Sequence, residues 1–303
     1  MTYIIADPLF RDHITPIGHP ESPQRYDAIV NALKGYTFYP ARDATRADLL
    51  RCHSGPYIDL VKREVEEGNS TLSTGDVEIS PKSYEAALRA AGAVLAGVDL
   101  VMEDKTKTVF CVVRPPGHHA CSEQGMGFCL FNNVAIGARY AQEKFGVKRV
   151  LIVDWDVHHG NGTQEIFHTD PTVFYFSTHQ FPLYPGTGTA EERGAGTIYN
   201  VPIFVSPKAR EEVLRAYEET LQIEMEKFQP ELVMISAGFD AHQNDPLGGL
   251  KLTTQDFVTL TESVKKVADT YAKGRTVSVL EGGYNLKAIA ESSKAHVDAL
   301  KKA

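Results

Sequence analysis

Short apolar runs rich in Val, Ile and Leu alternate along this chain with longer stretches in which apolar residues recur at helical spacing. Short runs bounded by Gly, Pro or polar residues are typical of strands buried on both faces, as in a parallel sheet. The alternation therefore predicts an α/β fold, with a mostly parallel central β-sheet and helices on both faces. The expected strands span residues 3–6, 108–113, 149–154, 172–177, 232–236 and 276–280.

The helical stretches carry start and stop signals of their own. Gly146 follows one stretch and Pro230 another, and Thr45 and either Thr253 or Thr254 suit N-caps. The expected helices span residues 22–33, 56–67, 83–102, 133–145, 209–228, 254–272 and 286–301, with a short one after Thr45. No linker, repeat or low-complexity tract interrupts the pattern, so we expect residues 1–303 to form a single domain.

Composition and charge exclude several classes of protein. With 303 residues, 43% of them hydrophobic, the chain can bury a large core. A formal net charge of -8 without a Lys/Arg-rich run argues against binding to nucleic acid or acidic membranes. The chain shows no N-terminal signal pattern and no apolar stretch long enough to span a bilayer. Its 4 cysteines lack C-x-x-C spacing and fit a reducing compartment, so we expect a cytoplasmic protein.

Residues suited to chemistry follow several of the expected strands directly. The segments are Arg114–His119, Asp154–Gly162, Ala237–Asp240 and Glu281–Tyr284. Binding sites of open α/β sheets form at the carboxyl ends of the strands. We therefore expect these segments to converge on one edge of the sheet.

The segment Asp154–Gly162 has the makeup of a metal site, because carboxylates and imidazoles crowd the end of an apolar run. Side chains alternate along an extended segment, so Asp154, Asp156 and His158 can share one side. A turn rich in Asp and Gly is the structural alternative, but carboxylates buried after a strand cost several kcal/mol unless a cation compensates. Asp240 or His242 is a candidate for a third ligand, and the spacing does not choose between them.

Two further loops carry candidate catalytic groups. His118 and His119 follow a loop stiffened by prolines, and neutral histidine is the usual general base near neutral pH. Tyr284 follows two glycines, where its phenol either donates a hydrogen bond to a developing oxyanion or simply packs over the sheet.

Taken in order, these motifs resemble the zinc-dependent histone deacetylase family. The resemblance runs from His19-Pro-Glu-Ser-Pro-Gln-Arg25 to the Tyr284 loop and includes Gly127-Phe128. It implies the single-domain arginase/deacetylase-like fold. The size is similar to that of bacterial members, which include acetylpolyamine amidohydrolases and acetoin-utilisation proteins.

The resemblance implies a role for each catalytic residue. It selects Asp240 over His242, so that zinc is held by Asp156, His158 and Asp240. It makes His119 the general base and proton donor, with His118 as its electrostatic neighbour. It makes Tyr284 the donor to the oxyanion.

The resemblance also implies supporting sites. Asp154 stands behind His118 and, with Ser177, resembles a monovalent-cation site, most simply for potassium. Asn161 stands behind His119, where some members have an acid, so a family pH optimum does not carry over. The narrow acyl-lysine channel corresponds to Asp76, Gly127, Phe128, Tyr184 and Leu247, with Arg25 buried near its inner end.

The activity implied is removal of acetyl or another short acyl group from the ε-amino group of lysine in proteins or peptides. Leu247 stands where one polyamine-preferring branch carries a glutamate, which favours acyl-lysine. The first alternative is the same chemistry on acetylated polyamines or other small acylated amines. The related ureohydrolases use a two-manganese pattern that this single cluster does not match. A non-catalytic acyl-lysine-binding protein is the alternative from another class.

Overall fold

A parallel sheet organises the molecule. The computed structural model describes residues 1–302, and within this range the sheet has 8 strands in the order β2-β1-β3-β8-β7-β4-β5-β6, every adjacent pair parallel. The strands are β1 (Thr2–Ile5), β2 (Thr37–Tyr39), β3 (Thr108–Cys111), β4 (Val150–Asp154), β5 (Val173–Gln180), β6 (Ile198–Ile203), β7 (Leu232–Ala237) and β8 (Thr276–Leu280). The carboxyl ends of all the strands therefore lie along the same side of the sheet.

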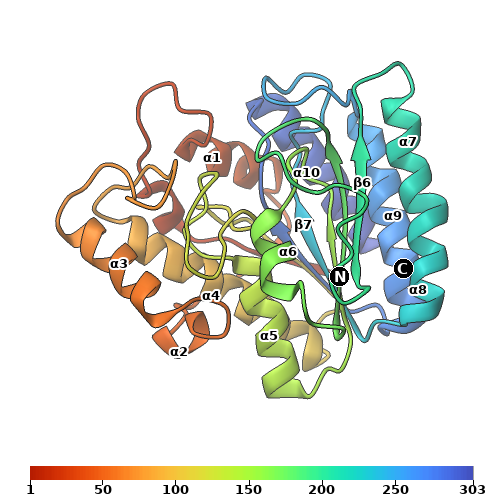
Figure 1. Cartoon of the computed structure of the whole chain (residues 1–303), viewed down its shortest axis with the longest axis horizontal. Coiled ribbons are helices and arrows are strands. Elements are labelled where there is room, and N and C mark those ends of the chain that lie inside the picture. The colour runs from red at the N-terminus through yellow and green to blue at the C-terminus, as the bar shows by residue number, and fades with distance from the viewer. Residues whose placement is uncertain (303) are drawn as a thin grey trace.

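Helices cover both faces of the sheet (Figure 1). They are α1 (Pro23–Ala32), α2 (Arg46–Leu49), α3 (Gly55–Glu66), α4 (Ser83–Met102), α5 (Asn133–Phe145), α6 (Asn161–Phe167), α7 (Ala209–Arg215), α8 (Leu221–Phe228), α9 (Thr254–Tyr271) and α10 (Leu286–Lys301). The layer of α4, α5 and α6 contacts β3, β7 and β5, whereas α1, α10, α9 and α7 form the other layer. A single-domain α/β fold with a parallel sheet is thus confirmed. No helix within residues 1–302 is long and apolar enough to cross a membrane.

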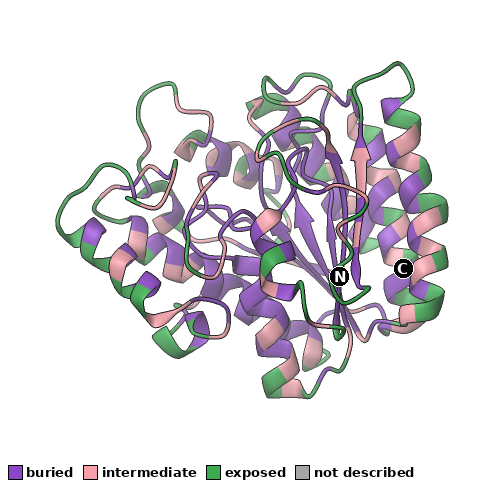
Figure 2. Ribbon diagram, viewed as in Figure 1, coloured by how far each residue is buried: buried purple, intermediate pink, exposed green. Residues whose placement is uncertain are grey.

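The burial pattern explains why the central strands were recognisable from sequence. Every residue of β3, β4, β7 and β8 is buried, which matches their continuous apolar character (Figure 2). The sequence prediction missed two strands, β2 and β6, which lie at opposite edges of the sheet. All of β2 is exposed, and β6 contains Pro202, which is tolerated at an edge because one side needs no ladder bond.

Helix ends follow the local sequence signals. Thr45 and Thr253 each form a capping box, in which Asp48 and Asp256 bond back to the capping residue. Of the two candidates, Thr253 and not Thr254 is therefore the N-cap of α9. The stretch expected as one helix from 209 to 228 contains a π-helical segment, η2 (Ala216–Thr220), between α7 and α8. A short 3-10 helix, η1 (Pro8–Arg11), and α6 were not predicted.

One histidine is buried in the core between α10 and the sheet. His296 has no exposed surface, and its ring packs edge-on against Phe110 and Trp155. Its ring nitrogens lie 2.7 Å from the Thr261 hydroxyl and 2.8 Å from the Ser278 hydroxyl. Burial lowers the pKa of His296 from 6.5 to about 3, so the ring is neutral in the folded protein.

We expect His296→Gln to flatten the dependence of stability on pH. In the wild type, the unfolded chain binds a proton at His296 below pH 6.5 while the folded chain does not. The stabilisation is therefore complete above that pH and is lost as the pH falls toward the folded value. Denaturant unfolding at pH 7 and pH 5 should show a wild-type loss about 2 kcal/mol larger than in the variant. Parallel pH dependences would contradict the account.

Candidate active site

The candidate site lies where neighbouring strands in the middle of the sheet end. β3, β8, β7 and β4 are consecutive in the sheet, and each is followed by one of the segments singled out from the sequence. These segments converge at the base of a cavity of about 260 Å³. The cavity is lined by Asp76, His119, Gly127, Phe128, His158, Leu183, Tyr184, Leu247 and Tyr284. All of these except Leu183 were candidate site residues.

Two carboxylates and an imidazole meet beneath this cavity. The Nδ1 atom of His158 lies 3.0 Å from an Asp156 oxygen and 3.2 Å from an Asp240 oxygen. The possible ligand atoms of the three residues all lie within 4.8 Å of one another. His242 does not join this cluster, because its Nδ1 accepts the Asn244 N–H at 3.1 Å and its ring stacks on Phe257. The structure therefore brings Asp240, and not His242, together with Asp156 and His158.

The cluster fits a divalent metal ion by its donors and its surroundings. Asp156 and Asp240 are at most 1% exposed, and buried carboxylates this close repel unless a cation compensates. Backbone N–H groups hold the remaining carboxylate oxygens, since Val157 donates to Asp240 at 2.8 Å and Gly282 to Asp156 at 2.8 Å. A Cβ at Gly282 would overlap the Asp240 carboxylate, so a side chain there would fill the cradle. Two oxygens and one nitrogen suit zinc with coordination positions left open.

The histidine pair is held from two sides. The Nδ1 of His118 donates to Asp154 at 3.0 Å, and the ring centroids of His118 and His119 lie 4.0 Å apart. The Glu281 carboxylate accepts the backbone N–H groups of Gly117 at 2.7 Å and His118 at 3.1 Å. Glu281, which directly follows β8, thereby holds the loop that follows β3.

The two imidazoles differ in their charge preference. Burial lowers the pKa of His118, but the negative charges of Asp154 and Asp156 outweigh burial and raise it to about 10. Burial, reinforced by the positive charges of His118 and His158, lowers the pKa of His119 well below 6.5. His118 is thus the charged member of the pair, and His119 is the neutral one.

Asn161 determines which nitrogen of His119 is free. Its Oδ1 lies 2.8 Å from the Nδ1 of His119, while its amide nitrogen lies 3.4 Å from Cys121 Sγ and 3.3 Å from Met126 Sδ. A thioether only accepts, so the amide nitrogen faces the sulfur atoms and the oxygen faces the imidazole. His119 therefore donates through Nδ1 and presents an unprotonated Nε2.

Tyr284 lies at the cavity wall between an aromatic ring and a cation. The ring centroids of Tyr284 and Phe128 are 6.2 Å apart. The guanidinium carbon of Arg25 lies 5.1 Å from the centroid of the Tyr284 ring. Burial raises the pKa of Tyr284 well above 10, which keeps the phenol protonated as a donor.

Asp154 and Ser177 are register partners on β4 and β5 and are both fully buried. The Asp154 carboxylate also accepts the Tyr175 hydroxyl at 2.9 Å, and the Ser177 hydroxyl lies 2.9 Å from His179 Nδ1. Neither residue belongs to the cluster of Asp156, His158 and Asp240, although Asp154 accepts the backbone N–H of Asp156 at 3.1 Å.

At the mouth of the cavity, Asp76 joins two loops. One oxygen of its carboxylate accepts the Gly127 N–H at 2.8 Å and the Tyr184 hydroxyl at 3.2 Å. Tyr184 is also stacked edge-on to His119, with centroids 5.2 Å apart. The walls expected from sequence therefore surround one opening.

Sequence reasoning missed the buried ion pairs that support these loops. Glu21 lies 2.5 Å from the Arg114 guanidinium and 2.9 Å from that of Arg25, and all three side chains are fully buried. Arg25 in turn donates to the backbone oxygens of Gly283 at 2.6 Å and Glu281 at 2.5 Å. Glu21 falls within the matched segment 19–25 and lies four residues before Arg25, but Arg114 is too distant in sequence for spacing to identify it as a partner.

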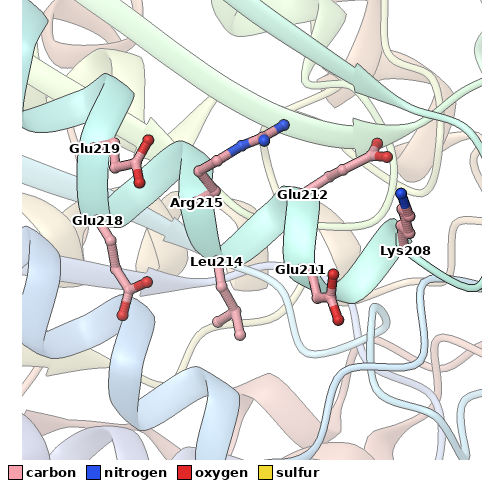
Figure 3. Close-up of a pocket in the computed structure, with 7 residues that line it drawn as sticks. All are labelled: Lys208, Glu211, Glu212, Leu214, Arg215, Glu218 and Glu219. Carbon is pink, nitrogen blue, oxygen red and sulfur yellow. The ribbon is translucent and has the colours of Figure 1, made fainter.

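A second hollow lies along α7 and is unlike the first (Figure 3). It is lined almost entirely by charged side chains of one helical stretch, Lys208, Glu211, Glu212, Leu214, Arg215, Glu218 and Glu219. These side chains splay away from the helix instead of converging on a point. They form a solvated helix face, not a site.

The chain is similar to known deacetylases over nearly its whole length. A sequence model of the histone deacetylase domain matches residues 19–300. An uncharacterized protein of Synechocystis sp. is 41% identical, covering 96% of this chain and 97% of that protein. A histone deacetylase-like amidohydrolase of Pseudomonas aeruginosa is 36% identical, covering 88% of this chain and 73% of that protein.

Structural comparison agrees with the sequence matches. The crystal structure of the HDA15 HD domain superposes with a TM-score of 0.89 at 36% identity, covering 99% of this chain and 87% of that one. The family is one of deacetylases and amidohydrolases, which supports a hydrolase that acts on acetylated substrates. By sequence and by fold, the chain belongs to the histone deacetylase family.

Proposed function

We propose that this protein is a zinc-dependent amidohydrolase that removes acetyl or other short acyl groups from the ε-amino group of lysine. The observation that carries the proposal is the meeting of Asp156, His158 and Asp240 with His119 and Tyr284 at one cavity. The proposal treats residues 1–303 as one catalytic domain. The cytoplasmic location expected from the sequence stays a prediction.

The metal ligands in this proposal are Asp156, His158 and Asp240. Zinc held there supplies a Lewis acid, which lowers the pKa of a water molecule and polarises the substrate's carbonyl group. The donor set and the absence of room for a side chain at Gly282 support this assignment.

His119 is the proposed general base and, later, the proton donor to the leaving amine. Its Nδ1–H is committed to Asn161, so its Nε2 takes a proton from the attacking water and returns it to the amine nitrogen. Its lowered pKa keeps it unprotonated at neutral pH. His118, charged beside Asp154, stabilises negative charge that develops nearby.

Tyr284 is the proposed hydrogen-bond donor to the tetrahedral oxyanion. A protonated phenol at the cavity wall donates most strongly once the carbonyl oxygen carries charge. Arg25 holds the Tyr284 loop by donating to the backbone oxygens of Gly283 and Glu281.

Substrate recognition is assigned to Asp76, Gly127, Phe128, Tyr184 and Leu247. Phe128 and Tyr184 offer apolar walls for the lysine methylenes, and the Asp76 carboxylate is available to N–H donors at the mouth. We also assign Asp154 and Ser177 to a potassium site, supported by their pairing on β4 and β5 and by their complete burial.

We expect a metal-dependent turnover that favours acyl-lysine. The purified protein is incubated with acetyl-lysine peptides, longer acyl-lysines and acetylpolyamines, before chelation, after chelation and after zinc is restored. Chelation should abolish hydrolysis and zinc should restore it, with the acetyl-lysine peptide among the best substrates. Absence of turnover of every amide by the zinc-loaded protein would favour a non-catalytic binder, and preference for polyamines would overturn the lysine assignment.

We expect Tyr284→Phe to lower kcat by about 100-fold or more, because one oxyanion donor is removed. The zinc content per chain should stay at the wild-type value, since the phenol is not a ligand. Full activity of this variant would mean that Tyr284 only packs over the sheet edge.

Alanine substitutions of Asp240 and His242 test which of the two residues is the third metal ligand. Asp240→Ala should lose bound zinc on dialysis, whereas His242→Ala should keep it, because only Asp240 lies beside His158. Metal content measured by mass spectrometry distinguishes the two. Zinc retained in the first variant and lost in the second would reverse the assignment.

A further inference from the structure

One carboxylate joins two loops that line the cavity. Asp245 lies in the loop that follows Asp240 and is only 8% exposed. Its Oδ2 accepts the backbone N–H of Tyr284 at 2.6 Å and that of Asn285 at 3.3 Å. Its Oδ1 accepts the backbone N–H of Leu247 at 3.0 Å. Both oxygens are therefore occupied, each by a different loop.

The two loops bring different groups to the cavity. Tyr284 carries the proposed oxyanion donor, and Leu247 forms part of the wall. Tyr284 and Asn285 follow Gly282 and Gly283, which lack side chains to fix the backbone, and Gly283 has a φ of 120°. A segment with this freedom needs an external partner if its next residue is to point reproducibly.

Asp245 also lies close to the start of α10. Asn285 is the N-cap of α10, a helix of 16 residues, and its side chain accepts the N–H of Ala288 at 2.9 Å. Asp245 thus faces the amino-terminal end of a long helix, where backbone N–H groups favour negative charge.

We propose that Asp245 is a positioning residue that holds the Tyr284 phenol and the Leu247 wall at a fixed separation across the acyl-lysine channel. The proposal rests on the proposed function, because it assigns Asp245 a part in the same reaction. Asp245 would then affect kcat by positioning Tyr284, and it would affect KM by positioning Leu247. The two effects can be measured separately.

Two substitutions separate these effects. Asp245→Ala removes both oxygens, so kcat should fall at least tenfold while the zinc content stays unchanged. Asp245→Asn keeps one oxygen, which should remain with Tyr284 and Asn285 because that side offers two donors. Its kcat should stay within about threefold of wild type, while KM rises several-fold and the preference for short over longer acyl chains weakens.

Asp256→Ala is the matched control for general destabilisation. Asp256 is 2% exposed and bonds to the N-cap of α9, so its loss should also lower the melting temperature. It is not part of the cavity lining, and kcat should stay within about twofold of wild type. A comparable loss of kcat in this control would overturn the proposal, because instability alone would then explain it.

A second measurement does not depend on activity. In protein labelled with [15N]tyrosine and [15N]leucine, Tyr284→Phe and Leu247→Met identify the two amide signals. Asp245→Ala should shift both amide protons upfield, and Asp245→Asn should shift that of Leu247 by more than that of Tyr284, whose hydrogen bond is kept but loses its charged acceptor. Unshifted signals in Asp245→Ala, or shifted signals with kcat within about twofold of wild type, would each overturn the positioning role. A wild type without turnover would instead contradict the proposed function, and the amide signals would still decide whether Asp245 holds the two loops.

Discussion

Two buried carboxylates, Asp156 and Asp240, approach the same imidazole at the end of the sheet, and the surrounding structure is arranged around their charge. Burying an ion costs several kcal/mol, and two like charges side by side cost more unless a cation joins them. Neighbouring backbone N–H groups and glycines let the carboxylates approach and hold them in place. A divalent metal ion bound by Asp156, His158 and Asp240 would offset the repulsion between these two carboxylates.

The rest of the site depends on a second set of buried charges. Glu21 sits between Arg114 and Arg25, and so ties the segment before α1 to the ends of β3 and β8. Glu281 completes the connection by accepting the N–H groups of Gly117 and His118. Loops far apart in sequence are thereby joined by buried Arg and Glu side chains whose partners are mostly backbone or charged groups. Removing one member leaves its buried partners without a hydrogen bond or counter-charge, which is costly. The network therefore holds these loops in a fixed position relative to Asp156 and Asp240.

Much of the fold was readable from sequence, and the reasons are local. Central strands such as β4 are apolar on both faces, and helix starts such as Thr45 carry their own caps. The edge strands β2 and β6 lack that signal, because an edge strand is not buried on both sides.

The sequence predicted those residues of the candidate site that directly follow a strand. Parallel strands end at one edge, so Asp156 and Asp240 were expected together, but the choice against His242 required the resemblance and then the contacts with Asn244 and Phe257. The roles of Glu21 and Asp245 were not readable, since the contacts of Glu21 with Arg114 and of Asp245 with Tyr284 form only in the folded chain. The most direct measurement is zinc K-edge X-ray absorption of protein loaded with one equivalent of zinc. The account predicts nitrogen and oxygen ligands only, with a single imidazole; sulfur ligation, or zinc that fails to bind stoichiometrically, would contradict it.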